Sequence, residues 1–202
     1  MVQLQQRLAG LLPDPQHSII QFISCRNQEG VSTIAQEFAR VLAEKQGKKV
    51  LLVDGDSEKM TQHHSFCIPP KMSLQQIMSN GGNLDQAITP VIHSRLFLAQ
   101  LSGDKSETVQ HEVVASKRDL WVHIRKQFDM IVIDSAPIDT SDEGLELCAV
   151  VDGVVMVVEA EKTRSHVISN LKERIIHNGG KLLGAVFNKQ HHYIPEWLYK
   201  RI

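Results

Sequence analysis

A run of ten residues near the beginning of the chain carries most of its recognisable chemistry. Residues 24–33 read Ser-Cys-Arg-Asn-Gln-Glu-Gly-Val-Ser-Thr and follow the apolar segment 19–23. Such a run between a strand and a helix is typical of loops that bind nucleoside triphosphates, where backbone N–H groups surround the phosphates and a hydroxyl group holds Mg²⁺. Gly30 and Ser32 fit this pattern, but Val31 stands where the phosphate-binding lysine belongs.

The loop is therefore predicted to be shaped for a nucleotide and to lack its principal positive charge. A hydrogen bond to a charged group contributes about 1.5–3 kcal/mol, so losing the lysine weakens nucleotide binding roughly tenfold to a hundredfold. Phosphoryl transfer is expected to suffer more, because charge moves onto the leaving oxygens in the transition state. The loop residues predicted to contact ATP or ADP are Arg26, Asn27, Gln28, Glu29, Gly30, Val31, Ser32 and Thr33.

Polar residues also follow three other apolar segments, at the positions where ligands bind in parallel α/β sheets. Asp54 and Asp134 suit Mg²⁺, which prefers a few carboxylates together with water and phosphate oxygens. Asp56 suits the orientation or deprotonation of an attacking nucleophile. Asn188 offers the donor and the acceptor that are needed to read an adenine edge. Taken singly, each of them also fits a turn or a helix cap.

Five short apolar segments position these residues at one edge of a predicted sheet. They are rich in valine and isoleucine and do not alternate with polar residues, as is typical of strands buried on both faces of a parallel sheet. The segments are 19–23, 50–53, 130–133, 154–158 and 182–187.

Helical patterns at 33–46 and 163–178 lie between the segments, and Gly47 is a plausible C-cap of the first. The alternation predicts an α/β fold with a doubly wound, mostly parallel sheet flanked by helices. We expect a single domain over 1–202, with an N-terminal helix or arm at 1–17 and a C-terminal tail at 189–202.

The composition of the chain narrows the possible partners. The 202 residues carry a formal net charge of −1, so nucleic acid is not expected as a partner. No segment approaches the ~20 apolar residues of a membrane span and no signal peptide is recognisable, which favours a cytoplasmic protein. The paired histidines His63-His64 and His191-His192 are expected to be exposed.

Taken together, four motifs resemble the CpsD/CapB group of bacterial tyrosine kinases (BY-kinases), relatives of the MinD/ParA ATPases. They are Glu-Gly-x-Ser-Thr at 29–33, Val-Leu-Leu-Val-Asp-Gly-Asp at 50–56, Phe-Asp-Met-Ile-Val-Ile-Asp-Ser-Ala-Pro at 128–137 and Gly-Ala-Val-Phe-Asn at 184–188. The resemblance implies a P-loop ATPase fold that takes ATP or ADP with Mg²⁺. It also implies Ser32, Asp54 and Asp134 as the magnesium site, Asp56 as the catalytic partner of Asp54, and Asn188 as a contact to the base.

The departures from this family pattern concern charge and assembly. Val31 replaces the family's lysine, and Arg26 stands where MinD-like relatives carry a second one. Only Arg7 matches the N-terminal pattern through which BY-kinases form rings, so a homo-oligomer stays open. The tail has only Tyr193 and Tyr199 in place of a tyrosine cluster. The family further implies a membrane-anchored polysaccharide co-polymerase as partner, which would place the chain at the inner face of the cell membrane.

Three interpretations follow. The first is a degenerate BY-kinase-like domain that regulates exopolysaccharide or capsule biosynthesis or export through protein contacts, with weak nucleotide turnover or none. The second is an active ATPase or tyrosine kinase in which Arg26 or a partner's residue replaces the lysine. The third is a MinD/ParA-type positioning ATPase.

Overall fold

The computed structural model describes residues 1–12, 14, 16–56, 61–69, 71–80, 82–102 and 118–190. Within these ranges seven strands form one sheet in the order β3-β4-β2-β5-β1-β6-β7, and every neighbouring pair except β3–β4 is parallel. The strands are β1 (Ser18–Ser24), β2 (Val50–Gly55), β3 (Thr89–Pro90), β4 (Leu96–Gln100), β5 (Met130–Ser135), β6 (Gly153–Glu159) and β7 (Leu182–Asn188). The predicted doubly wound, mostly parallel sheet is thus confirmed.

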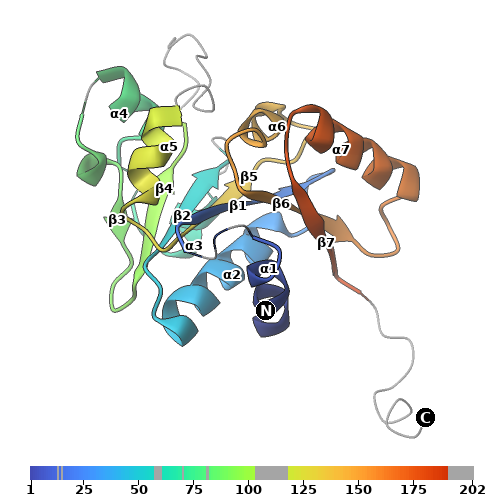
Figure 1. Cartoon of the computed structure of the whole chain (residues 1–202), viewed down its shortest axis with the longest axis horizontal. Helices are drawn as coiled ribbons and strands as arrows, with labels where there is room; N and C mark the ends of the chain where they lie inside the picture. The colour runs from blue at the N-terminus through green and yellow to red at the C-terminus, as the bar shows by residue number, and fades with distance from the viewer. Residues whose placement is uncertain are drawn as a thin grey trace, which may run out of the picture.

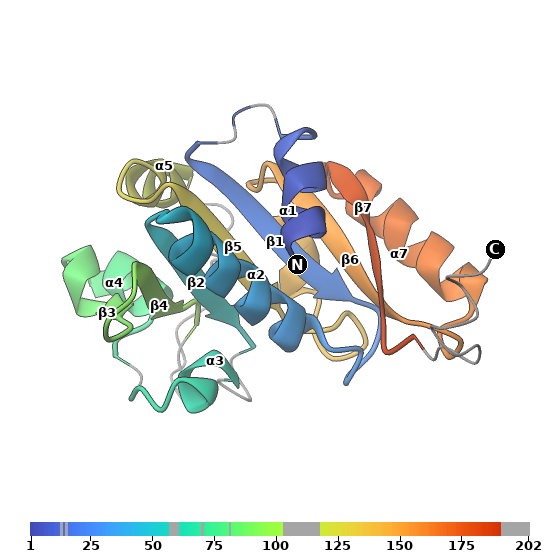
Figure 2. The same ribbon diagram turned by 90° about the horizontal axis from the view of Figure 1, so that it is seen from below.

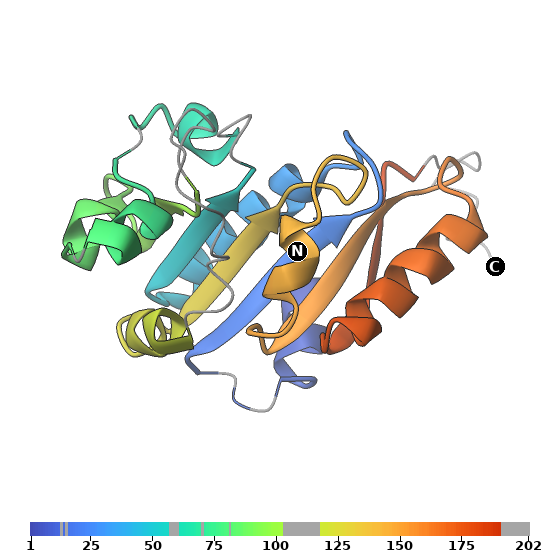
Figure 3. The ribbon, with the colours of Figure 1, turned by 90° about the horizontal axis from the view of Figure 1, so that it is seen from above.

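Helices cover both faces of this sheet (Figure 1). Helices α1 and α2 lie on one face, seen in front of the strands in Figure 2, and α5, α6 and α7 lie on the other, seen in front in Figure 3. The helices are α1 (Val2–Ala9), α2 (Val31–Gln46), α3 (Thr61–Ser65), α4 (Leu74–Asn80), α5 (Arg118–Arg125), α6 (Glu143–Leu147) and α7 (Ser165–His177), with a 3₁₀ turn at Leu84–Gln86.

Burial on both faces explains the largely apolar character of the central strands. Every residue of β1, β2 and β5 is buried. Phe22 of β1 packs against Phe38 of α2 on one face, while Ile131 of β5 packs with Trp121 of α5 on the other. Burying an aliphatic or aromatic side chain contributes about 1.5–3 kcal/mol, so these two faces supply the main stabilisation of the sheet.

The helix that follows the loop begins and ends as the sequence indicates. Gly47 adopts a left-handed conformation (φ 64°) and its N–H donates to the carbonyl of Leu42, which confirms the C-cap of α2. The helix predicted at 163–178 is observed as α7, Ser165–His177. The spacing of apolar residues in this segment predicts that Ile176 faces inward, but the residue is 55% exposed. The neighbouring edge strand β7 is likewise only partly buried.

Two further expectations are corrected by the fold. Strand β4 joins the sheet beside β2, although its sequence, Leu-Phe-Leu-Ala-Gln, was not predicted as a strand. His63 is buried at 3% exposure rather than exposed, since α3 packs against α2 and β2, whereas His64 is exposed as expected. His191 and His192, like the tail tyrosines, lie outside the described residues.

Candidate functional site

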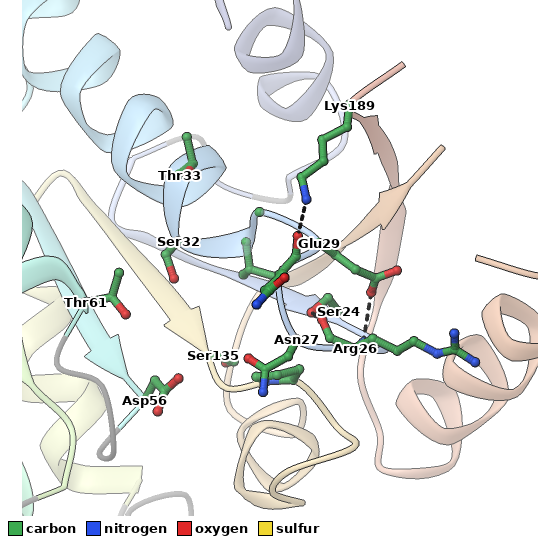
Figure 4. A pocket seen from close by; sticks show the side chains of 14 residues that line it. Ser24, Arg26, Asn27, Glu29, Ser32, Thr33, Asp56, Thr61, Ser135 and Lys189 are labelled. Atoms are coloured by element: carbon green, nitrogen blue, oxygen red, sulfur yellow. Dashed lines mark hydrogen bonds between the residues drawn. The ribbon is translucent and has the colours of Figure 1, made fainter. Parts of the chain in front are cut away.

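A cavity of about 560 Å³ lies at the carboxyl end of β1, where the loop between β1 and α2 faces residues that follow β2, β5 and β7 (Figure 4). Its volume falls within the ~300–1,000 Å³ that is usual for small-molecule sites. It is lined by Ser24, Arg26, Asn27, Gln28, Glu29, Gly30, Val31, Ser32, Thr33, Asp56, Thr61, Ser135, Pro137 and Lys189. All eight loop residues that the sequence nominated therefore line one cavity.

Two left-handed residues shape the loop. Gln28 has φ 66° and Gly30 has φ 93° at the N-cap of α2. The left-handed conformation of Gly30 favours glycine at this position. A Cβ atom there would also come within 2.1 Å of the Asn188 Nδ2 atom, so the Asn188 side chain would have to move.

The buried carboxylate of Glu29 braces the loop from inside. Its Oε2 atom accepts hydrogen bonds of 2.9 Å from the backbone N–H groups of both Cys25 and Arg26. Its Oε1 atom accepts a hydrogen bond from the Thr163 hydroxyl group, beyond the end of β6. The loop is thus tied to β6 by a side chain that lines the cavity and is itself 2% exposed.

The positive charges near the loop differ from those that the sequence suggested. Val31 is 7% exposed and packs in the core beneath the loop. Arg26 lines the cavity, but its side chain extends away from Ser32 and Asp56 (Figure 4). Lys189, which the sequence reasoning missed, reaches the loop from the end of β7.

Lys189 makes two polar contacts at the cavity wall. Its ammonium group donates a 2.6 Å hydrogen bond to the Gln28 carbonyl oxygen and lies 3.5 Å from the Glu159 carboxylate. The residue directly follows β7 and has a left-handed conformation, with φ 54°. Its only signal in the sequence was a basic residue directly after Asn188.

Asn188 itself contacts the loop backbone. Its Nδ2 atom donates a 2.9 Å hydrogen bond to the Glu29 carbonyl oxygen, and the side chain is not part of the cavity lining. Its proposed contact with a nucleotide base stays a prediction.

Asp54 and Asp134 lie side by side, because they are paired in register on the neighbouring strands β2 and β5. Both are 1% exposed. Burial, followed by the charge of Asp54, raises the pKa of Asp134 from 3.8 to about 7, while hydrogen bonds from Gln62 and Ser32 lower it. Asp56 lines the cavity, and its backbone N–H donates to Asp54 Oδ1 at 3.2 Å.

Gln62 of α3 contacts all three predicted magnesium-site residues. Its backbone N–H donates to Asp54 Oδ2 at 2.8 Å, and its side-chain amide donates to Asp134 Oδ2 at 2.8 Å and to the Ser32 carbonyl at 3.0 Å. Gln62 is 1% exposed and was not nominated from the sequence.

The donor set fits a magnesium ion in its chemistry. A hydroxyl group and two carboxylates are the hard oxygen ligands that Mg²⁺ prefers, and Asp134 Oδ1 is buried without a hydrogen-bond partner among the described residues. Ser32 lines the cavity, whereas Asp54 and Asp134 lie behind its wall with Gln62. No group of three or more His, Cys, Asp or Glu side chains suited to a metal occurs in the described part of the chain.

Comparison of the sequence with those of known proteins identifies the family of the chain. The sequence model of the family described as "AAA domain" (AAA_31) matches residues 19–178, and the chain belongs to this family.

The curated relatives narrow the family to bacterial tyrosine kinases. The chain is 30% identical over 177 residues to the tyrosine-protein kinase YwqD of Bacillus subtilis, covering 87% of this chain and 73% of that protein. It is 28% identical over 174 residues to the tyrosine-protein kinase CpsD of Streptococcus pneumoniae, covering 85% and 75%. The resemblance to the CpsD/CapB group is thereby confirmed.

The fold also matches that of a solved structure. The chimerical protein CapA2B2 superposes with a TM-score of 0.81 at 26% identity, over 94% of this chain and 83% of that one. In the ranges that the structure describes, every helix is too short or too polar to cross a membrane.

Proposed function

We propose that this chain is a BY-kinase-like P-loop domain that acts in exopolysaccharide or capsule biosynthesis or export, chiefly through contacts with other proteins, and that it binds ATP or ADP weakly with little or no turnover. The cavity is lined by a loop of the phosphate-binding type, and Asp56 and Ser32 both line it (Figure 4). These features support a nucleotide as the ligand.

The observation that carries the proposal is the burial of Val31 in the core. A loop that binds phosphates needs a cation, and an aliphatic side chain that packs into the core offers none. Arg26 extends away from Ser32, which disfavours the interpretation in which it replaces the lysine. Lys189 already contacts Gln28 and Glu159, so its charge is partly compensated before any phosphate arrives.

The first experiment measures ADP affinity by calorimetry on the full chain with Mg²⁺. We expect a dissociation constant no better than high micromolar, because the principal charged hydrogen bond is missing. A submicromolar constant would contradict the proposal.

Lys189→Met is expected to weaken ADP binding further, by about threefold to tenfold, because a half-exposed ammonium group contributes modestly. Lys181→Met is the matched control. Lys181 is also a lysine whose ammonium group donates to a backbone carbonyl, that of Leu11, but it does not line the cavity. Equal ADP affinities of the two variants would show that Lys189 does not contribute to ADP binding.

The partner proposed on the strength of the family is a membrane-anchored polysaccharide co-polymerase, which would bring the chain to the inner face of the cell membrane. We expect the tagged full chain to recover such a protein from the native membranes of its own host. Recovery of no co-polymerase, under conditions in which a BY-kinase control captures its own, would count against this partner.

A further inference from the structure

The side-chain amide of Gln62 occupies an oxygen atom of Asp134, one of the predicted magnesium-site residues. It joins the Ser32 carbonyl to Asp134 Oδ2 through hydrogen bonds of 3.0 and 2.8 Å. An amide N–H group is a positively polarised donor, so it satisfies a carboxylate oxygen as a metal ion or metal-bound water does.

Gln62 also forms a hydrogen bond with the second carboxylate, that of Asp54. The Gln62 backbone N–H donates to Asp54 Oδ2 at 2.8 Å. His63, the next residue of α3, places its Nδ1 atom 3.9 Å from that oxygen atom. Helix α3 therefore closes the carboxylate pair with two consecutive buried residues.

The contact between α3 and the two carboxylates leaves three polar atoms unpaired within the described part of the chain. Gln62 Oε1, His63 Nδ1 and Asp134 Oδ1 are all buried without a hydrogen-bond partner among the residues described. A buried polar atom without a partner costs about 1–3 kcal/mol. Three such atoms make the contact of α3 with the two carboxylates less stable, which favours displacement of Gln62 by a stronger ligand.

We propose that Gln62 competes with a divalent cation for Asp134 Oδ2, so that it sets the cation affinity of the predicted magnesium site beside the cavity. Binding of the cation breaks the hydrogen bond from the Gln62 side-chain amide to Asp134 and moves this amide out of the space between Asp134 and the Ser32 carbonyl. The inference rests on the proposed function, because the nucleotide's magnesium ion is the cation that such a site would hold.

The test compares Mn²⁺ binding, followed by the electron paramagnetic resonance of free Mn²⁺, in the full chain and in Gln62→Ala, without nucleotide. Because cation binding to this variant no longer breaks the charge-assisted hydrogen bond to Asp134, we expect Gln62→Ala to bind Mn²⁺ about tenfold to a hundredfold more tightly. Millimolar Mg²⁺ should likewise raise the unfolding temperature of the variant more than that of the parent.

Gln21→Ala is the matched control. Gln21 is equally buried, and its amide also donates two hydrogen bonds, to the Ser135 hydroxyl group and the Gly144 carbonyl, while its Oε1 atom accepts one from the Cys148 thiol. None of these three hydrogen bonds involves Asp54 or Asp134. It should lose stability without gaining metal affinity. If Gln62→Ala does not fold, Gln62→Asn retracts the amide by one methylene group and carries the same expectation.

The proposal is overturned if the Gln62 variant binds Mn²⁺ no more tightly than the parent. ADP binding in the presence of EDTA separates this failure from failure of the proposed function. If the parent binds ADP and Gln62→Ala gains no metal affinity, only the proposed role of Gln62 is refuted. If Gln62→Ala gains Mn²⁺ affinity and neither protein binds ADP, the role of Gln62 is supported and the proposed nucleotide ligand is refuted.

Discussion

Val31→Lys is expected to bind ADP with Mg²⁺ about tenfold to a hundredfold more tightly than the parent chain, since one charged hydrogen bond to phosphate contributes about 1.5–3 kcal/mol. The loop already has its left-handed turn at Gly30, its internal brace from Glu29 and a cavity that Val31 lines. A lysine at this position can lay its alkyl stem along the space of the valine and bring its ammonium group into the cavity.

Calorimetric titration of both proteins with ADP measures the effect, and Val31→Met is the control that adds length without charge. A gain shared equally by the lysine and methionine variants would trace the affinity to packing. If neither variant binds ADP more tightly than the parent, the loop has lost the shape that presents its N–H groups to phosphate. The hydrogen bonds from Asn188 and Lys189 to the loop carbonyls would then be the first contacts to test as the cause.

Asp134→Asn is expected to stabilise the folded chain at about pH 8 by up to about 4 kcal/mol, because one pKa unit corresponds to about 1.4 kcal/mol. Burial beside Asp54 raises the pKa of Asp134 from 3.8 to about 7. Between these values the folded protein binds a proton that the unfolded chain has released. The contribution of this group to stability therefore falls as the pH rises from about 4 to about 7, and the loss is complete above that range.

Urea denaturation across this pH range tests the expectation. The parent should show the falling slope and Asp134→Asn should lack it. Asp129→Asn serves as the control, because Asp129 accepts a backbone N–H bond from Lys49 at the opposite end of β5. An Asp134→Asn protein that is less stable than the parent at the alkaline end, or that keeps the parent's slope, would show that Asp134 is ionised without penalty in the fold.

The sheet and the loop could be predicted because they depend on local patterns. Valine- and isoleucine-rich runs buried on both faces identify the five parallel strands. The spacing from Gly30 to Thr33 identifies the loop, and the rule for carboxyl ends brings Asp56 to the cavity. Strand β4 was missed because Leu96–Gln100 follows an irregular stretch and gains its identity only by pairing with β2.

The details of the site depend on tertiary contacts that no local pattern encodes. Gln62 lies in a helix of five residues, and its partners Ser32 and Asp134 are 30 and 72 positions away in the chain. Lys189 contacts Gln28 of the loop although the two residues are 161 positions apart in the chain. Arg26 belongs to the loop, yet its side chain extends away from Ser32 and Asp56, a direction that its place in the sequence does not indicate (Figure 4).

The most direct test of an ATP-type cleft without its principal counter-charge is the transfer of radiolabelled γ-phosphate from ATP with Mg²⁺, to water or to the protein itself, measured on the purified chain. The account predicts transfer no faster than in Asp54→Ala, and a measurable rate only after Val31→Lys. Rapid metal-dependent hydrolysis or autophosphorylation by the unaltered chain, abolished by Asp54→Ala, would contradict it.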